Sequence, residues 1–317
     1  MKVLVAPSSF GDCGSQPLDR LRQHGYDLIM NPFGRKLTAG EVIELARDCV
    51  GIIAGVEPLT AEVMSQLPNL LCISRCGVGV ESIDLVEAKA RGIVVRNTPD
   101  GPTRAVAELT VGLALALLRR IPLADRNVRS GIWKKNIGNL LLGKTVGIVG
   151  LGRIGRAVAE LFVCMGCTVQ ATDPFPNAAW LGQHSVSAIS LENLLCQSDI
   201  VSLHLSLEAG SKPVVGKREL ALMKRSALLL NLARGEAVDE PSLYRALLEG
   251  RIAGAALDVF TSEPYCGCLV ELDNVVLTPH LGSYASESKL RMEILSVDNL
   301  IDALDHINRL IADKNGT

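Results

Sequence analysis

The stretch TVGIVGLGRIGR, residues 145–156, decides the fold of the larger part of the chain. The apolar run 145–149 is typical of a buried strand, three glycines in a GxGxxG pattern follow it, and RAVAELF, residues 156–162, indicates a helix. In such a turn the first glycine permits the tight bend, the second lets backbone N–H groups approach a pyrophosphate, and the third lets helix and strand pack closely. The stretch therefore predicts a dinucleotide site with the phosphates at a helix N-terminus.

The next predicted strand, residues 168–172, ends at Asp173. A carboxylate at this point can accept hydrogen bonds from the adenosine ribose hydroxyls and repels a 2′-phosphate. Pro174 and Phe175 follow, so neither an arginine nor a serine is placed to receive that phosphate. We predict NAD as the cofactor, held by Gly150, Gly152, Arg153, Ile154, Gly155 and Asp173.

Strand and helix patterns alternate on both sides of the glycine-rich turn. Six strands are predicted at 145–149, 168–172, 200–205, 227–232, 253–259 and 275–278. Four more are predicted before it, at 2–6, 51–54, 71–75 and 93–96, with helical patterns at 41–49, 61–67 and 85–90. This alternation predicts an α/β protein with two doubly wound parallel sheets.

A turn-prone segment, NTPDGP at 97–102, precedes a long helical pattern at 103–120, and we place the domain boundary there. The C-terminal part, 283–312, is predicted to be one long helix whose apolar side needs a surface to cover. Crossing back to the first domain would provide that surface.

Composition excludes several classes of protein. Of the 317 residues 48% are apolar and only 3% aromatic, and the net charge of −2 argues against binding to nucleic acid or to an anionic membrane. The first apolar run is too short for a signal peptide, and the most apolar stretch, 106–118, is too short to span a bilayer. Nine cysteines without framework spacing indicate reduced thiols and a cytoplasmic location.

Three polar side chains near predicted strand ends could perform chemistry on a substrate beside the cofactor. Hydride transfer to a ketone leaves an alkoxide that needs a proton, and a histidine such as His280 can supply it near neutral pH. Glu263 would stabilise the imidazolium and orient the ring, and we expect it within hydrogen-bonding distance of His280. Arg234 can hold a substrate carboxylate and polarise the adjacent carbonyl.

The same region permits a second interpretation. Cys266 and Cys268 lie between Glu263 and His280, so the four side chains could form a metal site of a zinc enzyme. However, cysteines one residue apart do not match the usual C-x₂₋₄-C spacing of zinc ligands. We therefore predict an acid–base pair and no metal, with the cysteines as loop residues.

Several linked motifs occur in one order along the chain: VGIVGLGRIGR at 146–156, NLARG at 231–235, ALDVF at 256–260 and TPHLGS at 278–283. With them the chain resembles the NAD-dependent D-2-hydroxyacid dehydrogenases, and within them most the D-3-phosphoglycerate dehydrogenase branch. SRCGVGVESID at 74–84 and NTPDGPTRAVAELT at 97–110 extend the resemblance to nearly the whole chain.

The resemblance implies a Rossmann-type NAD domain at 99–282 and a smaller flavodoxin-like substrate domain. The latter would be discontinuous, formed by 1–98 and 283–317, and would close over the site as a lid. It also implies a homodimer, and a short form without the regulatory domain of some relatives. The implied activity is interconversion of a D-2-hydroxy acid, such as phosphoglycerate or a similar anionic one, and its 2-oxo acid.

The implied site adds residues to those derived above. Arg234 would bind the 2-oxo acid, His280 would be the acid–base and Glu263 its partner. Thr98, Ala233, Asp258 and Gly282 match positions that line the cofactor in such enzymes. The substrate carboxylate would meet backbone amides of Gly77, Val78 and Gly79, and Arg75 matches a position that can face the phosphate.

The chain departs from the phosphoglycerate-specific pattern at three places, one of which is a shorter loop at Lys134-Lys135. Glu81-Ser82 stand where Asp-Asn is usual, and Ala54-Gly55 stand where an Arg-Ser pair is usual. An alternative function remains open on the same fold: an NAD-sensing corepressor or scaffold protein that retains the site but turns over little.

Overall fold

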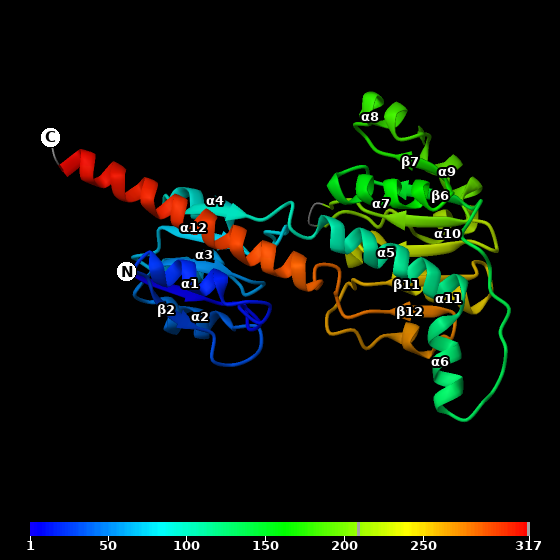
Figure 1. Cartoon of the computed structure of the whole chain (residues 1–317), viewed down its shortest axis with the longest axis horizontal. Helices are drawn as coiled ribbons and strands as arrows, with labels where there is room; N and C mark the ends of the chain where they lie inside the picture. The colour runs from blue at the N-terminus through cyan, green and yellow to red at the C-terminus, as the bar shows by residue number, and fades with distance from the viewer. Residues whose placement is uncertain (208–209, 316–317) are drawn as a thin grey trace. The chain divides into compact units, whose positions relative to one another are not determined.

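The computed structural model of the chain describes residues 1–207 and 210–315, and it divides them into two compact units (Figure 1). Unit 1 consists of Met1–Pro102 and Ser283–Thr317, and unit 2 is Thr103–Gly282. The expected fold class is confirmed, because each unit is built on one all-parallel sheet. Within the described ranges no helix is both long and apolar enough to cross a membrane.

Unit 1 holds a five-stranded sheet in the order β2-β1-β3-β4-β5. Its strands are β1 Lys2–Val5, β2 Asp27–Met30, β3 Cys49–Ala54, β4 Cys72–Arg75 and β5 Val94–Asn97. The connecting helices are α1 Gln16–Gln23, α2 Ala39–Ala46, α3 Ala61–Ser65 and α4 Leu85–Ala90. This strand order is that of flavodoxin-like folds. The sequence did not predict β2, a short edge strand with no fully buried residue.

The long C-terminal helix forms as α12, Ser286–Asn315, and packs on the sheet of unit 1 (Figure 1). Its buried face includes Val297, Leu300 and Leu304, which share a core with Val3 and Ile53 of the first and third strands. The chain thus returns to the unit in which it began. Packing against this sheet removes the apolar face of the helix from water.

Unit 2 holds a seven-stranded sheet in the order β12-β11-β10-β9-β6-β7-β8. Its strands are β6 Thr145–Val149, β7 Thr168–Thr172, β8 Val186–Ala188, β9 Ile200–Leu203, β10 Leu228–Asn231, β11 Gly254–Leu257 and β12 Val275–Leu277. Six of them were predicted, and β8 was not: it is a three-residue edge strand with two exposed residues. The order contains the doubly wound Rossmann arrangement with one further strand.

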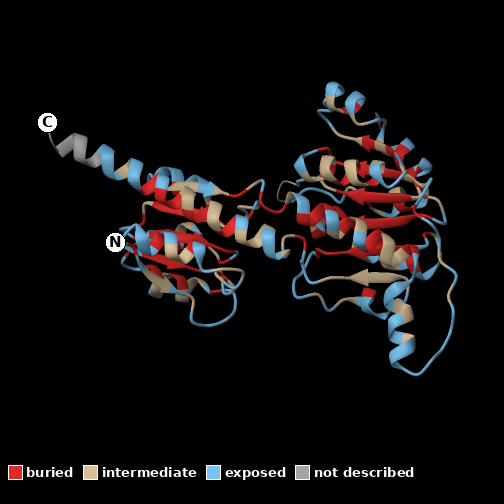
Figure 2. Ribbon diagram, viewed as in Figure 1, coloured by how far each residue is buried: buried red, intermediate tan, exposed pale blue. Residues whose placement is uncertain are grey.

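Helices cover both faces of this sheet. They are α5 Thr103–Leu118, α6 Ile121–Arg129, α7 Arg153–Cys164, α8 Ala178–Gln183, α9 Leu191–Gln197, α10 Lys217–Leu222 and α11 Glu240–Leu248, with 3₁₀ turns η1 Gly235–Ala237 and η2 Cys268–Glu271. On one face Leu113 of α5 and Phe162 of α7 share a core with Ile148, and on the other Leu194 of α9 packs with Leu229. Figure 2 shows that the central strands of this sheet are largely buried. The strands are consequently buried on both sides, which leaves their carboxyl ends for binding.

One partly buried histidine lies at the carboxyl end of this sheet. His204 follows β9, its Nε2 is 2.7 Å from Ser202 Oγ, and its Nδ1 is shielded from solvent without a partner among the described residues. Burial lowers the pKa of His204 to about 3. The ring therefore stays neutral in the folded protein, whereas in the unfolded chain it gains a proton below about pH 6.5.

We predict that His204 makes the protein sensitive to mild acid. Because the folded-state pKa is depressed, its contribution to stability is complete above about pH 6.5 and is lost progressively as the pH falls toward 3. Between pH 7.0 and 5.5 the wild type should lose on the order of 1 kcal/mol more unfolding free energy than His204→Gln. Urea unfolding at both pH values measures this. Parallel losses in the two proteins would contradict it, and His24→Gln at an exposed position is the control.

Candidate active site

The glycine-rich turn joins β6 to α7 with very little space. Gly150 has a φ of +95°, and a Cβ added to Gly155 would lie 1.9 Å from the Gly150 carbonyl oxygen, so only glycine fits there. Gly152 is different: it is exposed, and an added Cβ would meet no atom within 4 Å. It precedes the twelve-residue helix α7, which begins with Arg153 and Ile154. The open backbone at Gly152 and the helix N-terminus fit a pyrophosphate.

Asp173 lies beside this turn. Its Oδ2 accepts a hydrogen bond of 2.7 Å from Leu151 N–H, and its Oδ1 accepts one of 2.8 Å from Phe175 N–H. The carboxylate is half-buried at the carboxyl end of β7, next to the glycines. It is thereby held where the adenosine ribose of NAD would meet it, so the residues present fit the predicted cofactor.

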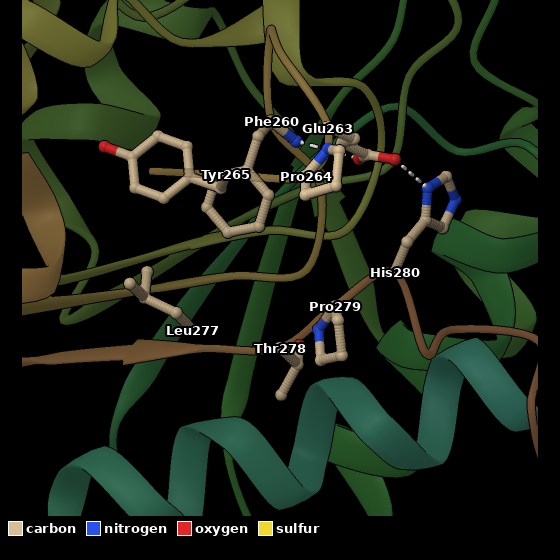
Figure 3. Close-up of a pocket in the computed structure, with 8 residues that line it drawn as sticks. All are labelled: Phe260, Glu263, Pro264, Tyr265, Leu277, Thr278, Pro279 and His280. Atoms are coloured by element: carbon tan, nitrogen blue, oxygen red, sulfur yellow. Dashed lines mark hydrogen bonds and ion pairs between the residues drawn. The ribbon is translucent and has the colours of Figure 1, made fainter. Parts of the chain in front are cut away.

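Glu263 and His280 form a hydrogen-bonded pair (Figure 3). Nδ1 of His280 is 3.0 Å from Glu263 Oε2, and the other oxygen of Glu263 accepts a hydrogen bond of 3.1 Å from Phe260 N–H. Because an ionised carboxylate only accepts hydrogen bonds, the geometry assigns the hydrogen to Nδ1 and leaves Nε2 for proton exchange. The side chains are 56% and 39% exposed for His280 and Glu263, so a ligand can reach them.

The backbone around His280 is held by Asp258. His280 has a φ of +56°, and its N–H donates to the Asp258 carbonyl oxygen at 2.9 Å. The Asp258 carboxylate, which is 1% exposed, accepts hydrogen bonds from Thr278 Oγ1, Leu281 N–H and Gly282 N–H at 2.6, 2.7 and 2.8 Å. A histidine keeps a left-handed backbone conformation only where the surrounding contacts hold it there. The buried carboxylate of Asp258 supplies these contacts.

A pocket of about 520 Å³ adjoins the pair and is lined by Phe260, Glu263, Pro264, Tyr265, Leu277, Thr278, Pro279 and His280 (Figure 3). The rings of Phe260 and Tyr265 are stacked, with centroids 4.3 Å apart. The Glu263–His280 pair is therefore flanked by an apolar wall on one side.

Arg234 follows β10 in a tightly held turn. Asn231, fully buried, donates from Nδ2 to the Arg234 carbonyl oxygen at 2.9 Å and accepts from Ala233 N–H at 3.1 Å. A Cβ on Gly235 would lie 2.0 Å from the Phe260 carbonyl carbon, so the turn packs directly against the segment that carries Glu263. Nη1 of Arg234 donates to Ala233 O at 2.8 Å.

The other predicted substrate residues belong to unit 1, in the turn after β4. Gly77 N–H donates to Thr98 Oγ1 at 2.8 Å, while Arg75 donates from Nε to Gly79 O at 3.0 Å and from Nη1 to Cys76 O. Among the hydrogen bonds of the described residues, none uses the N–H groups of Val78 or Gly79. These amides can therefore serve an anion.

The cysteines of the loop after Glu263 are both exposed. Within residues 1–207 and 210–315 no three His, Cys, Asp or Glu side chains are arranged to hold a metal ion. Asn231 and Thr278 were not singled out from the sequence. The only signal for them was their place, in the last two residues of a predicted strand and two positions before a candidate site residue.

Comparison with known proteins places this geometry in a family. Residues 111–282 match the family description "D-isomer specific 2-hydroxyacid dehydrogenase, NAD binding domain". A glyoxylate reductase of Korarchaeum cryptofilum is 40% identical over 82% of the chain and 81% of its own length. A D-3-phosphoglycerate dehydrogenase of Archaeoglobus fulgidus is 36% identical over 95% of the chain, which spans 57% of that relative.

A solved structure, that of the TT0316 protein from Thermus thermophilus, is similar over 96% of this chain and 97% of its own, with a TM-score of 0.88 and 37% identity. The similarity in sequence and the similarity in fold agree. The chain belongs to the D-isomer specific 2-hydroxyacid dehydrogenases, a family of NAD-dependent oxidoreductases.

Proposed function

We propose that this protein interconverts a D-2-hydroxy acid and its 2-oxo acid, with His280 as the acid–base. The observation that carries the proposal is the 3.0 Å hydrogen bond between His280 Nδ1 and Glu263 in the same unit as the dinucleotide turn. Both flank strand ends of one parallel sheet, the edge at which such sheets bind ligands.

We propose that NAD is held by the turn from Gly150 to Gly155 and by Asp173, with Ala233, Asp258, Gly282 and Thr98 near its nicotinamide half. When bound, the nicotinamide supplies the hydride acceptor, or in reduced form the donor. Asp173 disfavours a 2′-phosphate through charge repulsion and through its hydrogen bonds to Leu151 and Phe175, which fix the carboxylate in place.

His280 Nε2 takes the substrate hydroxyl proton during oxidation and returns a proton to the carbonyl oxygen during reduction. Glu263 stabilises the imidazolium that exists between these events and prevents the ring from turning. The Arg234 guanidinium can hold the substrate carboxylate in a fork. In that position its positive charge polarises the adjacent 2-oxo group. The amides of the 77–79 turn, organised by Arg75, bind the substrate carboxylate.

The two relatives named above differ in substrate: one is a glyoxylate reductase and the other a phosphoglycerate dehydrogenase. Phosphoglycerate or a similar anionic 2-hydroxy acid therefore stays a candidate beside glyoxylate. A panel of glyoxylate, pyruvate, hydroxypyruvate and phosphohydroxypyruvate with NADH tests the proposal.

We predict that His280→Gln lowers kcat with the best 2-oxo acid by about 10²–10⁴, since proton transfer contributes that much. Glu263→Gln should lower kcat less and leave NADH affinity unchanged, because the imidazole remains but loses its charge partner. Stopped-flow and steady-state NADH oxidation measure both, and His24→Gln is the control. Equal turnover by wild type and His280→Gln would reject His280 as the acid–base. No turnover by either would favour an NAD-sensing protein.

We predict that substitutions at two glycines of the turn have different effects, one mainly on cofactor binding and the other on stability. Gly152→Ala should keep the wild-type melting temperature within about 2 °C, because its Cβ has space, yet weaken NADH binding at least tenfold. Gly155→Ala should lower the melting temperature by several degrees, since its Cβ meets the Gly150 carbonyl. Thermal melts and NADH fluorescence titration measure the two effects. Identical behaviour of both variants would refute this assignment.

We further propose a homodimer in a reducing, cytoplasmic compartment. The segment after α5 exposes many large apolar side chains: Ile121, Val128, Ile132, Trp133, Ile137, Leu140 and Leu142. Trp133 is 85% and Ile137 93% exposed, which is unfavourable for a surface that remains in water. A second copy would cover them, and nine cysteines without framework spacing support the compartment.

We predict that Trp133→Asp with Ile137→Asp converts the dimer to a monomer, because burying two carboxylates at an apolar interface is strongly unfavourable. Light scattering after size-exclusion chromatography gives the mass. Phe175→Asp, which changes an equally exposed apolar side chain elsewhere in unit 2, should leave the dimer intact. A wild-type monomer, or a dimer that survives the double change, would contradict the proposed interface.

A further inference from the structure

Arg156 is the first residue after the glycine-rich turn, and the sequence did not single it out as a cofactor residue. Its Nε donates a hydrogen bond of 2.9 Å to the carbonyl oxygen of Leu151. Its backbone N–H donates one of 3.0 Å to the carbonyl oxygen of Gly152. The side chain therefore reaches back over the turn, and one residue of α7 holds two successive carbonyl groups of the turn.

The peptide units around Leu151 are fixed from two directions. Leu151 N–H donates to Asp173 Oδ2 at 2.7 Å, while Leu151 O accepts from Arg156. The peptide unit between Leu151 and Gly152 is trans, so its C=O and its N–H point in opposite directions. Because Arg156 binds the oxygen of this unit, the N–H of Gly152 points away from Arg156.

The N–H of Gly152 is the group of the turn that this arrangement leaves for a ligand. Gly152 is exposed, and within the part of the chain that the structure describes no hydrogen bond uses its N–H. The Leu151 N–H, in contrast, is already occupied by Asp173. The direction of the Gly152 N–H, and with it the fit of a pyrophosphate, therefore depends on the contact that Arg156 makes with Leu151.

Trp180 of α8 holds the Arg156 guanidinium in place. The central carbon of the guanidinium lies 5.5 Å from the centroid of the indole ring, within the range of a cation–π interaction. Trp180 packs against the core of unit 2, and its ring is stacked with that of His184 at 4.4 Å between centroids. His184 Nδ1 lies 2.8 Å from the Trp180 carbonyl oxygen, and its Nε2 lies 3.3 Å from Glu160 Oε1. The guanidinium thus rests on an aromatic ring that is itself fixed.

This support decides whether the hydrogen bond to Leu151 is effective. A long, partly exposed side chain loses rotamer freedom when it makes a single hydrogen bond, so an unsupported contact contributes little. The ring of Trp180 restricts Arg156 in advance and removes part of that cost. A planar guanidinium can lie on an aromatic ring and donate a hydrogen bond at the same time, whereas the ammonium group of lysine has no such plane.

We propose that Arg156, held by Trp180, is a positioning residue for the pyrophosphate of NAD. It fixes the peptide unit between Leu151 and Gly152 so that the Gly152 N–H faces the cofactor, and it acts through this peptide rather than by touching the cofactor. The inference rests on the proposed cofactor site, because it takes the glycine-rich turn as the place of the pyrophosphate. Loss of Arg156 therefore weakens cofactor binding and leaves the groups of proton transfer unchanged.

NADH fluorescence titration of wild type, Arg156→Met and Arg156→Lys tests the role of the arginine. Both substitutions should raise the Kd for NADH about tenfold, because lysine keeps the charge but cannot stack and donate together. Arg218→Met is the matched control: Arg218 is exposed on α10 of the same unit, and its loss should change the Kd less than about twofold. Wild-type affinity in Arg156→Met or in Arg156→Lys overturns the proposal.

A change at Trp180 tests whether the ring acts through the arginine. Trp180→Leu keeps the positive charge of Arg156 and should still raise the Kd for NADH. The double variant of Arg156→Met with Trp180→Leu should bind NADH no more weakly than Arg156→Met alone, because the ring has no further effect once the arginine is gone. Losses that add in the double variant, or wild-type affinity in Trp180→Leu, overturn the role of the ring.

Two further readouts separate positioning of the pyrophosphate from a general structural role. In Arg156→Met the affinity for ADP-ribose, which has the pyrophosphate but no nicotinamide, should fall by the same factor as that for NADH. The kcat at saturating NADH should stay within about twofold of wild type. Unchanged ADP-ribose affinity, or a fall in kcat without a change in Kd, overturns the proposal. A wild type that binds NADH but reduces no 2-oxo acid would reject the proposed function, and the titrations would still decide this inference.

Discussion

The buried carboxylate of Asp258 is the interaction on which the proposed proton-transfer site depends. It links the end of β11 to the segment after β12 through three hydrogen bonds, to Thr278, Leu281 and Gly282, and the carbonyl of the same residue holds His280 N–H. A fully buried acid with its acceptors satisfied contributes rigidity, since any displacement would leave a desolvated charge unpaired. Through this rigidity a left-handed histidine on an exposed loop stays within 3.0 Å of Glu263.

Polar side chains also fix the turns at the neighbouring strand ends by hydrogen bonds. Asn231 ties the turn of Arg234, and Asp173 ties the glycine turn through Leu151. In each case a polar side chain at a strand end accepts a hydrogen bond from, or donates one to, the backbone of a turn at the same edge of the sheet. The functional groups are consequently placed by regular elements of the sheet, and their loops have little freedom.

Much of this could be predicted from the sequence, for a physical reason. Buried parallel strands are continuous apolar runs, so β6 and β9 are visible, and a glycine turn between strand and helix has a local signature. Edge strands such as β2 and β8 lack full burial and therefore lack the pattern. The pairing of Glu263 with His280 could be predicted for two reasons. An acid–base histidine needs a carboxylate partner, and both residues follow the ends of predicted strands. The bonds of Asp258 to Leu281 and Gly282 could not be predicted, because they depend on the register between β11 and β12.

Family membership alone does not define the substrate. The family match covers 111–282, which lies wholly in unit 2, whereas the turn at 77–79, which is proposed to bind the substrate carboxylate, lies in unit 1. Cofactor geometry and proton transfer are common demands of the reaction, so the residues that meet them can be shared by relatives with different substrates. Recognition of the rest of a substrate is a separate demand, and it is met by differences in contact and charge rather than by the residues of the reaction itself. Relatives can therefore differ in substrate while the residues that serve the cofactor and the proton stay the same.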